Sequence, residues 1–297
     1  MRLEDIKKIV VLGSGIMGSG IAEVCARAGY QVALVDISDE LLKKGLDRIK
    51  VSMGKAVEKG KLSKEDAEAA YARIKPTTSF EEACKDADVV IEAIPENMEL
   101  KKKVFKQLDE ICPEKTIFAS NTSSLMITDM ASATKRPDRF IGMHWFNPAP
   151  IMKLIEIIRG ALTSDETYNL IKALSEKLGK ITATAMDAPG FFTSRIINLW
   201  LLEALKCLEE GIATVKDIDL MCKLAFNHPM GPFELLDLVG LDTALHVMEY
   251  LHKEFGDPRY APPLILKKMV MAGYLGDPRL KPGSKGGIYD YFKIPKQ

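Results

Sequence analysis

The 297-residue sequence predicts an α/β fold, with a doubly wound, mostly parallel sheet followed by an all-helical C-terminal domain. Three observations predict it. Short apolar runs alternate with helical patterns through the first half, three glycines follow the first run, and residues 192–253 contain no convincing strand. The Pro-Gly pair at 189–190 marks the expected boundary. We therefore expect one domain over residues 1–186 and a second over residues 187–297.

Seven apolar runs are candidate strands, and helical patterns separate the first five. They are Lys8–Leu12, Gln31–Val35, Asp88–Ile94, Lys115–Ser120, Arg139–Trp145, Met152–Ile158 and Ile181–Ala185. Residues 38–73 make one connection unusually long. Its pattern predicts an inserted helical hairpin, with one helix from Ser38 to about Lys59 and another from Ser63 to about Arg73. A long excursion of this kind often has a function of its own.

Helical patterns dominate the C-terminal domain. We expect helices over Phe192–Glu210 and Val215–Phe226, and a third from near Phe233 to Phe255 with a break near Gly240. The sequence alone gives no reason to place a strand among them.

Composition argues against several classes of protein. Lys+Arg and Asp+Glu both number 41, so the formal net charge is zero and no nucleic-acid partner is expected. No apolar run approaches the roughly 20 residues of a membrane span, and the N-terminus lacks the apolar segment of a signal peptide. The five cysteines are widely spaced and form no C-x-x-C, which favours reduced thiols over a disulfide framework or a zinc site. We expect a cytoplasmic protein without a metal.

The first apolar run leads into the glycine motif Gly13, Gly15 and Gly18, and a helical segment over Ile21–Ala28 follows. Such a context is typical of a Rossmann-type dinucleotide-binding unit. The first glycine allows the sharp turn, the second lets the backbone approach a pyrophosphate, and the third lets the helix pack on the strand. The start of the helix favours an anion, so Ile16 and Met17 are expected at the cofactor. A plain strand–turn–helix glycine turn is the alternative.

The second run ends at Asp36, where the Rossmann-type unit places a carboxylate. Asp36 would accept hydrogen bonds from the ribose hydroxyls of the cofactor. Because a carboxylate repels a 2′-phosphate, the sequence predicts NAD rather than NADP.

A second candidate site lies in residues 141–156. His144 ends an apolar run, and Glu156 stands among four aliphatic residues, where a buried carboxylate needs a partner. The two are equally distant in sequence from Pro150, so a chain reversal there would let them face each other. Glu156 would then fix the tautomer of His144, whose other nitrogen would take a proton near neutral pH. The alternative is a core histidine with an unrelated glutamate.

A third polar cluster, residues 120–124, follows the run Lys115–Ser120. One interpretation is a helix cap for the segment after Leu125. The other is a ligand site, because the carboxyl ends of strands are where open α/β sheets bind ligands. In that case the hydroxyls would hold a substrate oxygen, and Asn121 would contact the cofactor.

Together these residues resemble the L-3-hydroxyacyl-CoA dehydrogenase family, especially its short-chain 3-hydroxybutyryl-CoA dehydrogenases. The resemblance covers essentially the whole chain. It rests on VLGSGIMGSGIA, SNTSSL from Ser120, GMHWFNPAP, MKLIEII, and MGPFELLDLVGLD from Met230. It implies a catalytic base at His144, its paired carboxylate at Glu156, and contacts of Ser123 with substrate and nicotinamide.

The resemblance also implies further contacts and a partner. The implied cofactor contacts are Glu96, Lys101 and Asn147, and the implied coenzyme A contacts are Ser52 and Lys59 in the predicted hairpin. The helical domain would form a homodimer interface.

Three positions depart from the family pattern. Ser194 stands where the family usually has an asparagine that contacts substrate, and Trp145 replaces a phenylalanine. Gly283 stands where a cofactor-contacting lysine is expected, with Lys281 and Lys285 nearby. A serine is shorter than an asparagine, so Ser194 would reach the substrate through a water.

The sequence thus predicts an NAD-dependent enzyme that reversibly oxidises an L-3-hydroxyacyl-CoA, with 3-hydroxybutyryl-CoA as the expected substrate. His144 and Glu156 would act as the general base, while Ser123 and Ser194 position the reacting oxygen. Alternatives are a dehydrogenase of a free small hydroxy acid, a non-catalytic dinucleotide-binding protein, and a subunit that passes substrate to a separate hydratase. Acyl chain length and physiological direction stay open at this stage.

Overall fold

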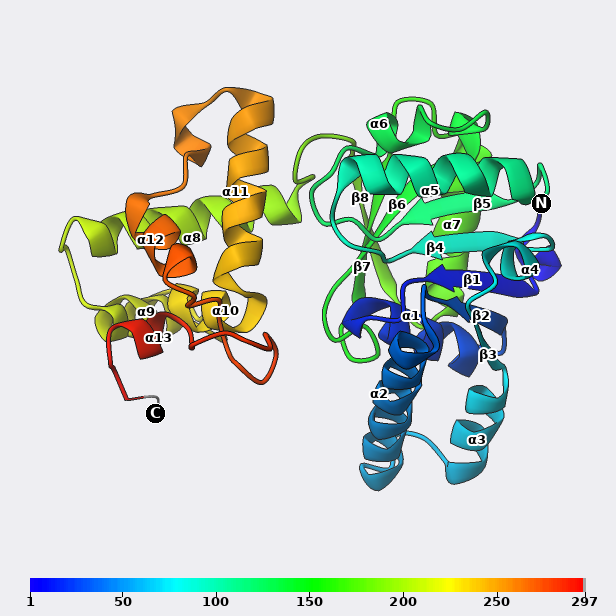
Figure 1. Cartoon of the computed structure of the whole chain (residues 1–297), viewed down its shortest axis with the longest axis horizontal. Coiled ribbons are helices and arrows are strands. Elements are labelled where there is room, and N and C mark those ends of the chain that lie inside the picture. The colour runs from blue at the N-terminus through cyan, green and yellow to red at the C-terminus, as the bar shows by residue number, and fades with distance from the viewer. Residues whose placement is uncertain (296–297) are drawn as a thin grey trace. The chain divides into compact units, whose positions relative to one another are not determined.

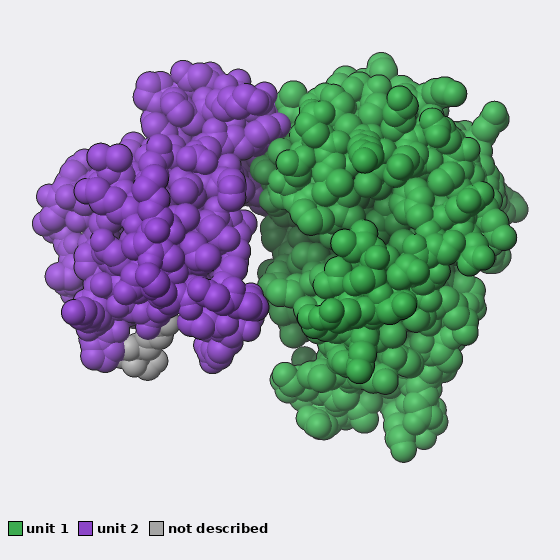
Figure 2. Space-filling model, in the orientation of Figure 1, with its two compact units in different colours: residues 1–188 green, residues 189–297 purple. Residues whose placement is uncertain are grey.

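The chain divides into two compact units in the computed structural model, which describes residues 1–295 (Figures 1 and 2). The first unit is Met1–Ala188, and the second begins at Pro189. The division falls at the Pro189-Gly190 pair that interrupts the helical and strand patterns.

The first unit is built around an eight-stranded sheet in the order β3-β2-β1-β4-β5-β6-β7-β8. The strands are β1 (Lys8–Leu12), β2 (Gln31–Val35), β3 (Ile74–Thr77), β4 (Val89–Glu92), β5 (Ile117–Ser120), β6 (Phe140–Trp145), β7 (Leu154–Arg159) and β8 (Ile181–Met186). All neighbours pair in parallel except β6 and β7, which are antiparallel. The predicted fold class, a Rossmann-type mostly parallel sheet with a helical C-terminal domain, is confirmed.

Helices cover both faces of the sheet (Figure 1). They are α1 (Ile16–Arg27), α2 (Asp39–Glu58), α3 (Lys64–Ala72), α4 (Phe80–Cys84), α5 (Met98–Ile111), α6 (Ile127–Ala131) and α7 (Asp165–Lys177), with short 3-10 helices at Leu3–Asp5 and Pro137–Arg139. On one face Ile9 and Ile91 pack in a core with Ile21 of α1. On the other, Phe118 and Phe140 pack against Phe105 of α5 in tilted and edge-to-face contacts. Strands buried on both faces read as continuous apolar runs, which is why the sequence reveals them.

The inserted hairpin is α2 and α3, which project away from the sheet in Figure 1. Both helices begin as the sequence predicts, because Ser38 accepts a hydrogen bond from the Leu41 N–H and Ser63 from the Asp66 N–H.

In this unit one strand was missed, and one helix begins earlier than expected. β3 was not predicted, because it is a four-residue edge strand that contains Pro76. α1 begins at Ile16 rather than Ile21, because its first turns contain Gly18 and Gly20, whose low helix propensity hides the pattern.

The second unit contains only helices among its described residues. They are α8 (Thr193–Glu209), α9 (Val215–Ala225), α10 (Pro232–Val239), α11 (Leu241–Phe255), α12 (Leu264–Met271) and α13 (Ile288–Tyr291), with a 3-10 helix at Pro258–Tyr260. Phe233, Leu236 and Met248 lie in their common core. The predicted break at Gly240 separates α10 from α11, where the backbone φ of +104° suits glycine.

Within residues 1–295, no helix is both long and apolar enough to cross a bilayer, and no group of side chains suits a metal ion. The five cysteines of this part of the chain are free.

Candidate active site

The glycine motif forms the loop between β1 and α1, and each glycine has a different environment. A Cβ on Gly13 would lie 2.5 Å from the Ala93 carbonyl oxygen, and one on Gly18 would lie 1.8 Å from the Gly13 carbonyl oxygen. At Gly15 a Cβ would meet nothing within 4 Å. Gly13 and Gly18 are therefore required by packing, whereas Gly15 leaves an open approach to the backbone.

The open approach lies at the N-terminus of α1. Gly15 is the N-cap and has no side chain to accept hydrogen bonds from the first turn, which contains Ile16 and Met17. These N–H groups and the helix dipole favour an anion. The loop thus fits the pyrophosphate of a dinucleotide.

Asp36 lies against this loop, directly after β2. Its Oδ2 accepts hydrogen bonds from the backbone N–H and the hydroxyl of Ser14, both at 2.6 Å, and its Oδ1 accepts from the Ile37 N–H at 2.7 Å. A carboxylate oxygen has room for more than one donor, so Asp36 can still accept from a ribose hydroxyl. The loop and Asp36 fit NAD.

His144 and Glu156 occupy facing positions on the antiparallel strands β6 and β7. The Nδ1 of His144 lies 2.9 Å from Oε2 of Glu156, and the two residues are only 7% and 2% exposed. The predicted contact is therefore present. An ionised carboxylate can only accept a hydrogen bond, so this contact suits the imidazole tautomer that has its hydrogen on Nδ1.

The polar cluster after β5 connects the other parts of this sheet edge. Asn121 accepts a hydrogen bond from the Trp145 N–H at 3.0 Å through its Oδ1, which ties the cluster to the end of β6 beside His144. The Ser123 N–H donates to Oε1 of Glu96 at 3.1 Å. These contacts place the cluster, Glu96 and the His144 strand at one edge of the sheet, where its parallel strands end.

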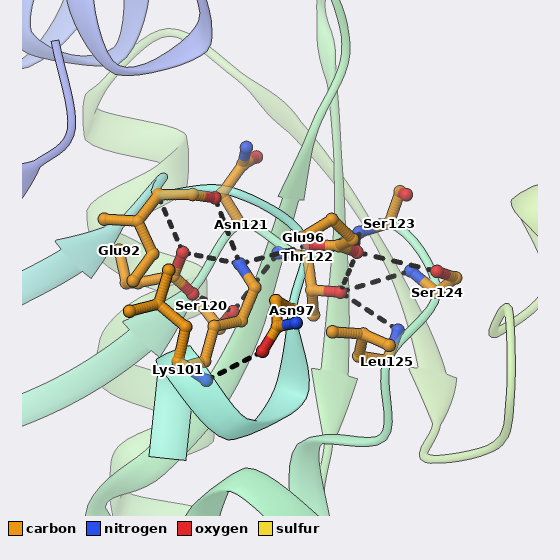
Figure 3. A network of polar contacts seen from close by, with 12 residues as sticks. Glu92, Glu96, Asn97, Lys101, Ser120, Asn121, Thr122, Ser123, Ser124 and Leu125 are labelled. Atoms are coloured by element: carbon orange, nitrogen blue, oxygen red, sulfur yellow. Dashed lines mark hydrogen bonds and ion pairs between the residues drawn. The ribbon is translucent and has the colours of Figure 1, made fainter. Parts of the chain in front are cut away.

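Lys101 and Glu96 meet in this region, together with a residue that sequence reasoning missed, Glu92 (Figure 3). The Lys101 ammonium lies 2.5 Å from Oε1 of Glu92 and 3.1 Å from Oε2 of Glu96. Burial alone would lower the pKa of Lys101, but the two carboxylates outweigh it and raise that pKa. A carboxylate that ends an apolar strand, nine residues before a lysine, was the available signal for Glu92.

The implied coenzyme A residues lie on the hairpin. Ser52 is half-buried on α2 and faces Glu23 of α1. Burial raises the pKa of Glu23, and the hydroxyl of Ser52 partly offsets this rise. Lys59 is the exposed C-cap residue of α2. The two lie seven positions apart, about two helical turns, so they share one face of the helix.

The other predicted site residues are less connected. Asn147 is exposed just after β6, next to the end of the strand that carries His144. Ser194 lies on α8 of the second unit and is 8% exposed; its carbonyl accepts from Nδ2 of Asn198 at 2.8 Å.

Gly283 is exposed with a φ of +87°. Both lysines near it, which could replace the expected cofactor-contacting lysine, already have polar partners within the second unit. Lys281 donates to Thr243 and pairs with Asp242, and Lys285 donates to the Ala272 carbonyl.

Comparison with known proteins identifies the family. A family model described as "3-hydroxyacyl-CoA dehydrogenase, NAD binding domain" matches residues 8–188, and one described as "3-hydroxyacyl-CoA dehydrogenase, C-terminal domain" matches residues 190–291. A "Probable 3-hydroxybutyryl-CoA dehydrogenase" of Bacillus subtilis is 48% identical over 97% of this chain and 98% of its own length. The human "Hydroxyacyl-coenzyme A dehydrogenase, mitochondrial" is 41% identical over 96% of this chain and 91% of its own.

Solved structures agree with the sequence comparisons. The crystal structure of (S)-3-hydroxybutyryl-CoA dehydrogenase from Ralstonia eutropha superposes with a TM-score of 0.88 and 47% identity, covering 92% of this chain and 96% of that chain. Because the two family models together match almost the whole sequence, this protein belongs to the 3-hydroxyacyl-CoA dehydrogenase family and is an NAD-dependent oxidoreductase.

Proposed function

We propose that this enzyme reversibly oxidises a short-chain L-3-hydroxyacyl-CoA, with 3-hydroxybutyryl-CoA as its preferred substrate, to the 3-ketoacyl-CoA. The relatives from Bacillus subtilis and Ralstonia eutropha, whose names specify 3-hydroxybutyryl-CoA, support this chain length. The observation that carries the proposal is the contact of 2.9 Å between His144 and Glu156.

Oxidation of an alcohol removes a hydride and a proton, and NAD, when bound, supplies the hydride acceptor. In our proposal, Nε2 of His144 takes the hydroxyl proton. Glu156 keeps the imidazole in the required tautomer and stabilises the imidazolium that forms. Ser123 and Ser194 position the oxygen that loses its proton.

The cofactor would be held at two ends. The backbone of Gly13, Gly15 and Gly18, with Ile16 and Met17, would bind the pyrophosphate, and Asp36 the adenine ribose. At the other end, Asn121, Ser123, Asn147 and Glu96 would surround the nicotinamide.

Coenzyme A would bind along the hairpin, with Lys59 facing its phosphates and Ser52 on the same helix face. An exposed cation at the end of α2 suits a phosphate, and a small free acid would not extend that far.

We also infer that the enzyme is a homodimer through its second unit. Large apolar side chains are exposed along α9 and just beyond it: Leu220 is 50% exposed, Leu224 77% and Phe226 63%. Contiguous apolar surface of this kind favours burial against another chain.

A reducing compartment, such as the cytoplasm, fits the free cysteines.

The test is a comparison of kcat/KM for L-3-hydroxybutyryl-CoA and free L-3-hydroxybutyrate, with NADP as a cofactor control. The thioester should be preferred by at least about 100-fold, because the free acid lacks the coenzyme A contacts. Lys59→Ala should raise KM for the thioester several-fold, and Lys43→Ala, another exposed lysine of α2, should not. Preference for the free acid would favour a hydroxy-acid dehydrogenase, and no NADH from either substrate would favour a non-catalytic dinucleotide-binding protein.

A further inference from the structure

A closed ring of polar contacts joins three elements at the end of the sheet (Figure 3). We call it the polar ring, and its members are Glu92, Lys101, Glu96, Thr122 and Ser120. Glu92 Oε1 contacts the Lys101 ammonium, which also contacts Glu96 Oε2. Glu96 Oε1 accepts from the Thr122 hydroxyl, the Thr122 N–H donates to Ser120 Oγ, and Ser120 Oγ donates to Glu92 Oε2 at 2.6 Å.

Two of the three charged residues of the ring are completely buried. Glu92 is 0% exposed and Lys101 1%, whereas Glu96 is exposed. Both oxygens of Glu92 are satisfied, because Oε1 also accepts from the Ile94 N–H at 2.8 Å. A buried ion pair gives little net stability compared with apolar side chains of similar size. Its benefit here is the fixed geometry of the groups that it holds.

The held group is the loop that carries Ser123. Glu96 accepts from the Ser123 N–H, and Ser120 and Glu96 together fix Thr122 on both its backbone and its hydroxyl. The Asn121 N–H donates to the Glu92 carbonyl at 2.8 Å, in the same loop. Each backbone position from 121 to 123 is therefore tied to the ring or to Glu92 itself.

We propose that Glu92 and Lys101 are positioning residues of the dehydrogenase, which act through Glu96 and Ser120 to hold the Ser123 loop at the nicotinamide end of the cofactor site. Lys101 was expected to contact the cofactor itself. Because 1% of its surface is exposed and its ammonium lies between two carboxylates, it also acts on the loop through Glu96. The inference rests on the proposed place of Ser123 beside the nicotinamide.

The adenine end of the cofactor site offers an internal reference. Asp36 is held by Ser14 and Ile37, neither of which belongs to the ring. ADP-ribose carries the adenine, the pyrophosphate and both riboses but no nicotinamide. A change in the ring should therefore weaken the binding of NADH and leave the binding of ADP-ribose almost unchanged.

The experiment measures dissociation constants of NADH and ADP-ribose, together with thermal stability, for the full chain and for Glu92→Gln. The matched control is Asp109→Asn, which weakens another buried ion pair of the same helix. Asp109 is on α5 and receives a hydrogen bond of 2.7 Å from Arg136 Nε, with side-chain exposures of 5% and 11%.

Glu92→Gln should raise the dissociation constant of NADH about tenfold, since misplacement of a positioning group is costly. The dissociation constant of ADP-ribose should rise by less than about twofold. Asp109→Asn should lower the thermal midpoint with both affinities unchanged. Equal weakening of the two ligands by Glu92→Gln, no weakening of NADH, or the same selective pattern in Asp109→Asn would overturn the proposal.

A milder variant covers the case in which Glu92→Gln does not fold. Ser120→Ala removes one hydroxyl of the ring and no charge. It should weaken the binding of NADH selectively, by about threefold, since the hydrogen bonds of this hydroxyl with Glu92 and with the Thr122 N–H are both lost. Unchanged NADH affinity would then overturn the inference. Both ligands bind without substrate, so these results stand whether or not the wild-type enzyme oxidises the proposed thioester.

Discussion

The His144–Glu156 pair and the polar ring lie at the same edge of the sheet, but they are built differently. The pair comes from two neighbouring strands, and antiparallel register alone brings its side chains within 2.9 Å. The ring comes from the ends of β4 and β5 and from the start of α5, and it needs five polar contacts to close. Side chains on paired strands need little support, whereas side chains and backbone in loops need a network.

The two regions also differ in whether they are expected to exchange a proton during the reaction. In our proposal, the pair takes up a proton at the imidazole of His144 during the reaction. In the ring, Glu92 and Glu96 raise the pKa of Lys101, so its ammonium keeps its proton. The pair is suited to carry a proton, and the ring is suited to hold a loop in place.

The largest expected effect separates these roles at His144. His144→Gln retains an N–H that can donate to Glu156 but removes the base, so kcat should fall by about 1,000-fold or more. NADH affinity should stay within about twofold, because the ring is intact. Steady-state kinetics and ligand titration on the same preparation check both, and a kcat close to that of the wild type would remove His144 from the mechanism.

The next effect concerns stability and belongs to the ring. Lys101→Met leaves the buried Glu92 carboxylate facing Glu96 without its cation, and this should lower the free energy of unfolding by about 3 kcal/mol. Urea unfolding measures the loss. A loss below about 0.5 kcal/mol would mean that the ring is solvated and not the buried support described here.

Glu156→Gln tests whether the pair acts as a unit. The amide oxygen can still accept from Nδ1 but has no charge to stabilise the imidazolium, so kcat should fall by about 100-fold. Combined with His144→Gln it should add almost nothing, because residues that act together give non-additive losses. Fully additive losses in the double-mutant cycle would mean that Glu156 acts independently of His144.

The smallest effect is a pH dependence of the ring. The pKa of Lys101 is raised above its ordinary value of 10.5, so its contribution to stability is fully present below that value and is lost as the pH rises through the folded-state pKa. The stability difference between wild type and Lys101→Met should therefore be constant from about pH 6 to about pH 9 and shrink only above about pH 10.5. A difference that changes in the neutral range would show that the charge of Lys101 is not fixed there.

The pair could be predicted from the sequence because its cues are local. Glu156 stands in an apolar run, His144 ends another, and Pro150 lies midway between them. The glycine loop and the hairpin caps at Ser38 and Ser63 are local as well. These features depend on residues close together in the chain, so a single sequence reveals them.

The ring could not be predicted, because its members become neighbours only after β4 and β5 pair and α5 packs on them through Lys101 and Phe105. For Lys101 the family resemblance implied a cofactor contact, but nothing in the sequence indicated its burial against Glu92. β3 escaped prediction for a similar reason: Ile74–Thr77 gains its strand only by pairing with β2. Contacts between distant segments decide these positions, and local pattern does not report them.

The central claim is that His144 takes the hydroxyl proton during oxidation of a 3-hydroxyacyl-CoA. The most direct test is the first turnover of NADH formation from L-3-hydroxybutyryl-CoA, followed by rapid mixing with NAD-saturated wild type and His144→Gln. A first turnover slowed by about 1,000-fold or more in the variant, with equal cofactor affinity, is the result that our account predicts. A first turnover of equal speed in the two proteins would contradict it, because the proton would then leave by another route.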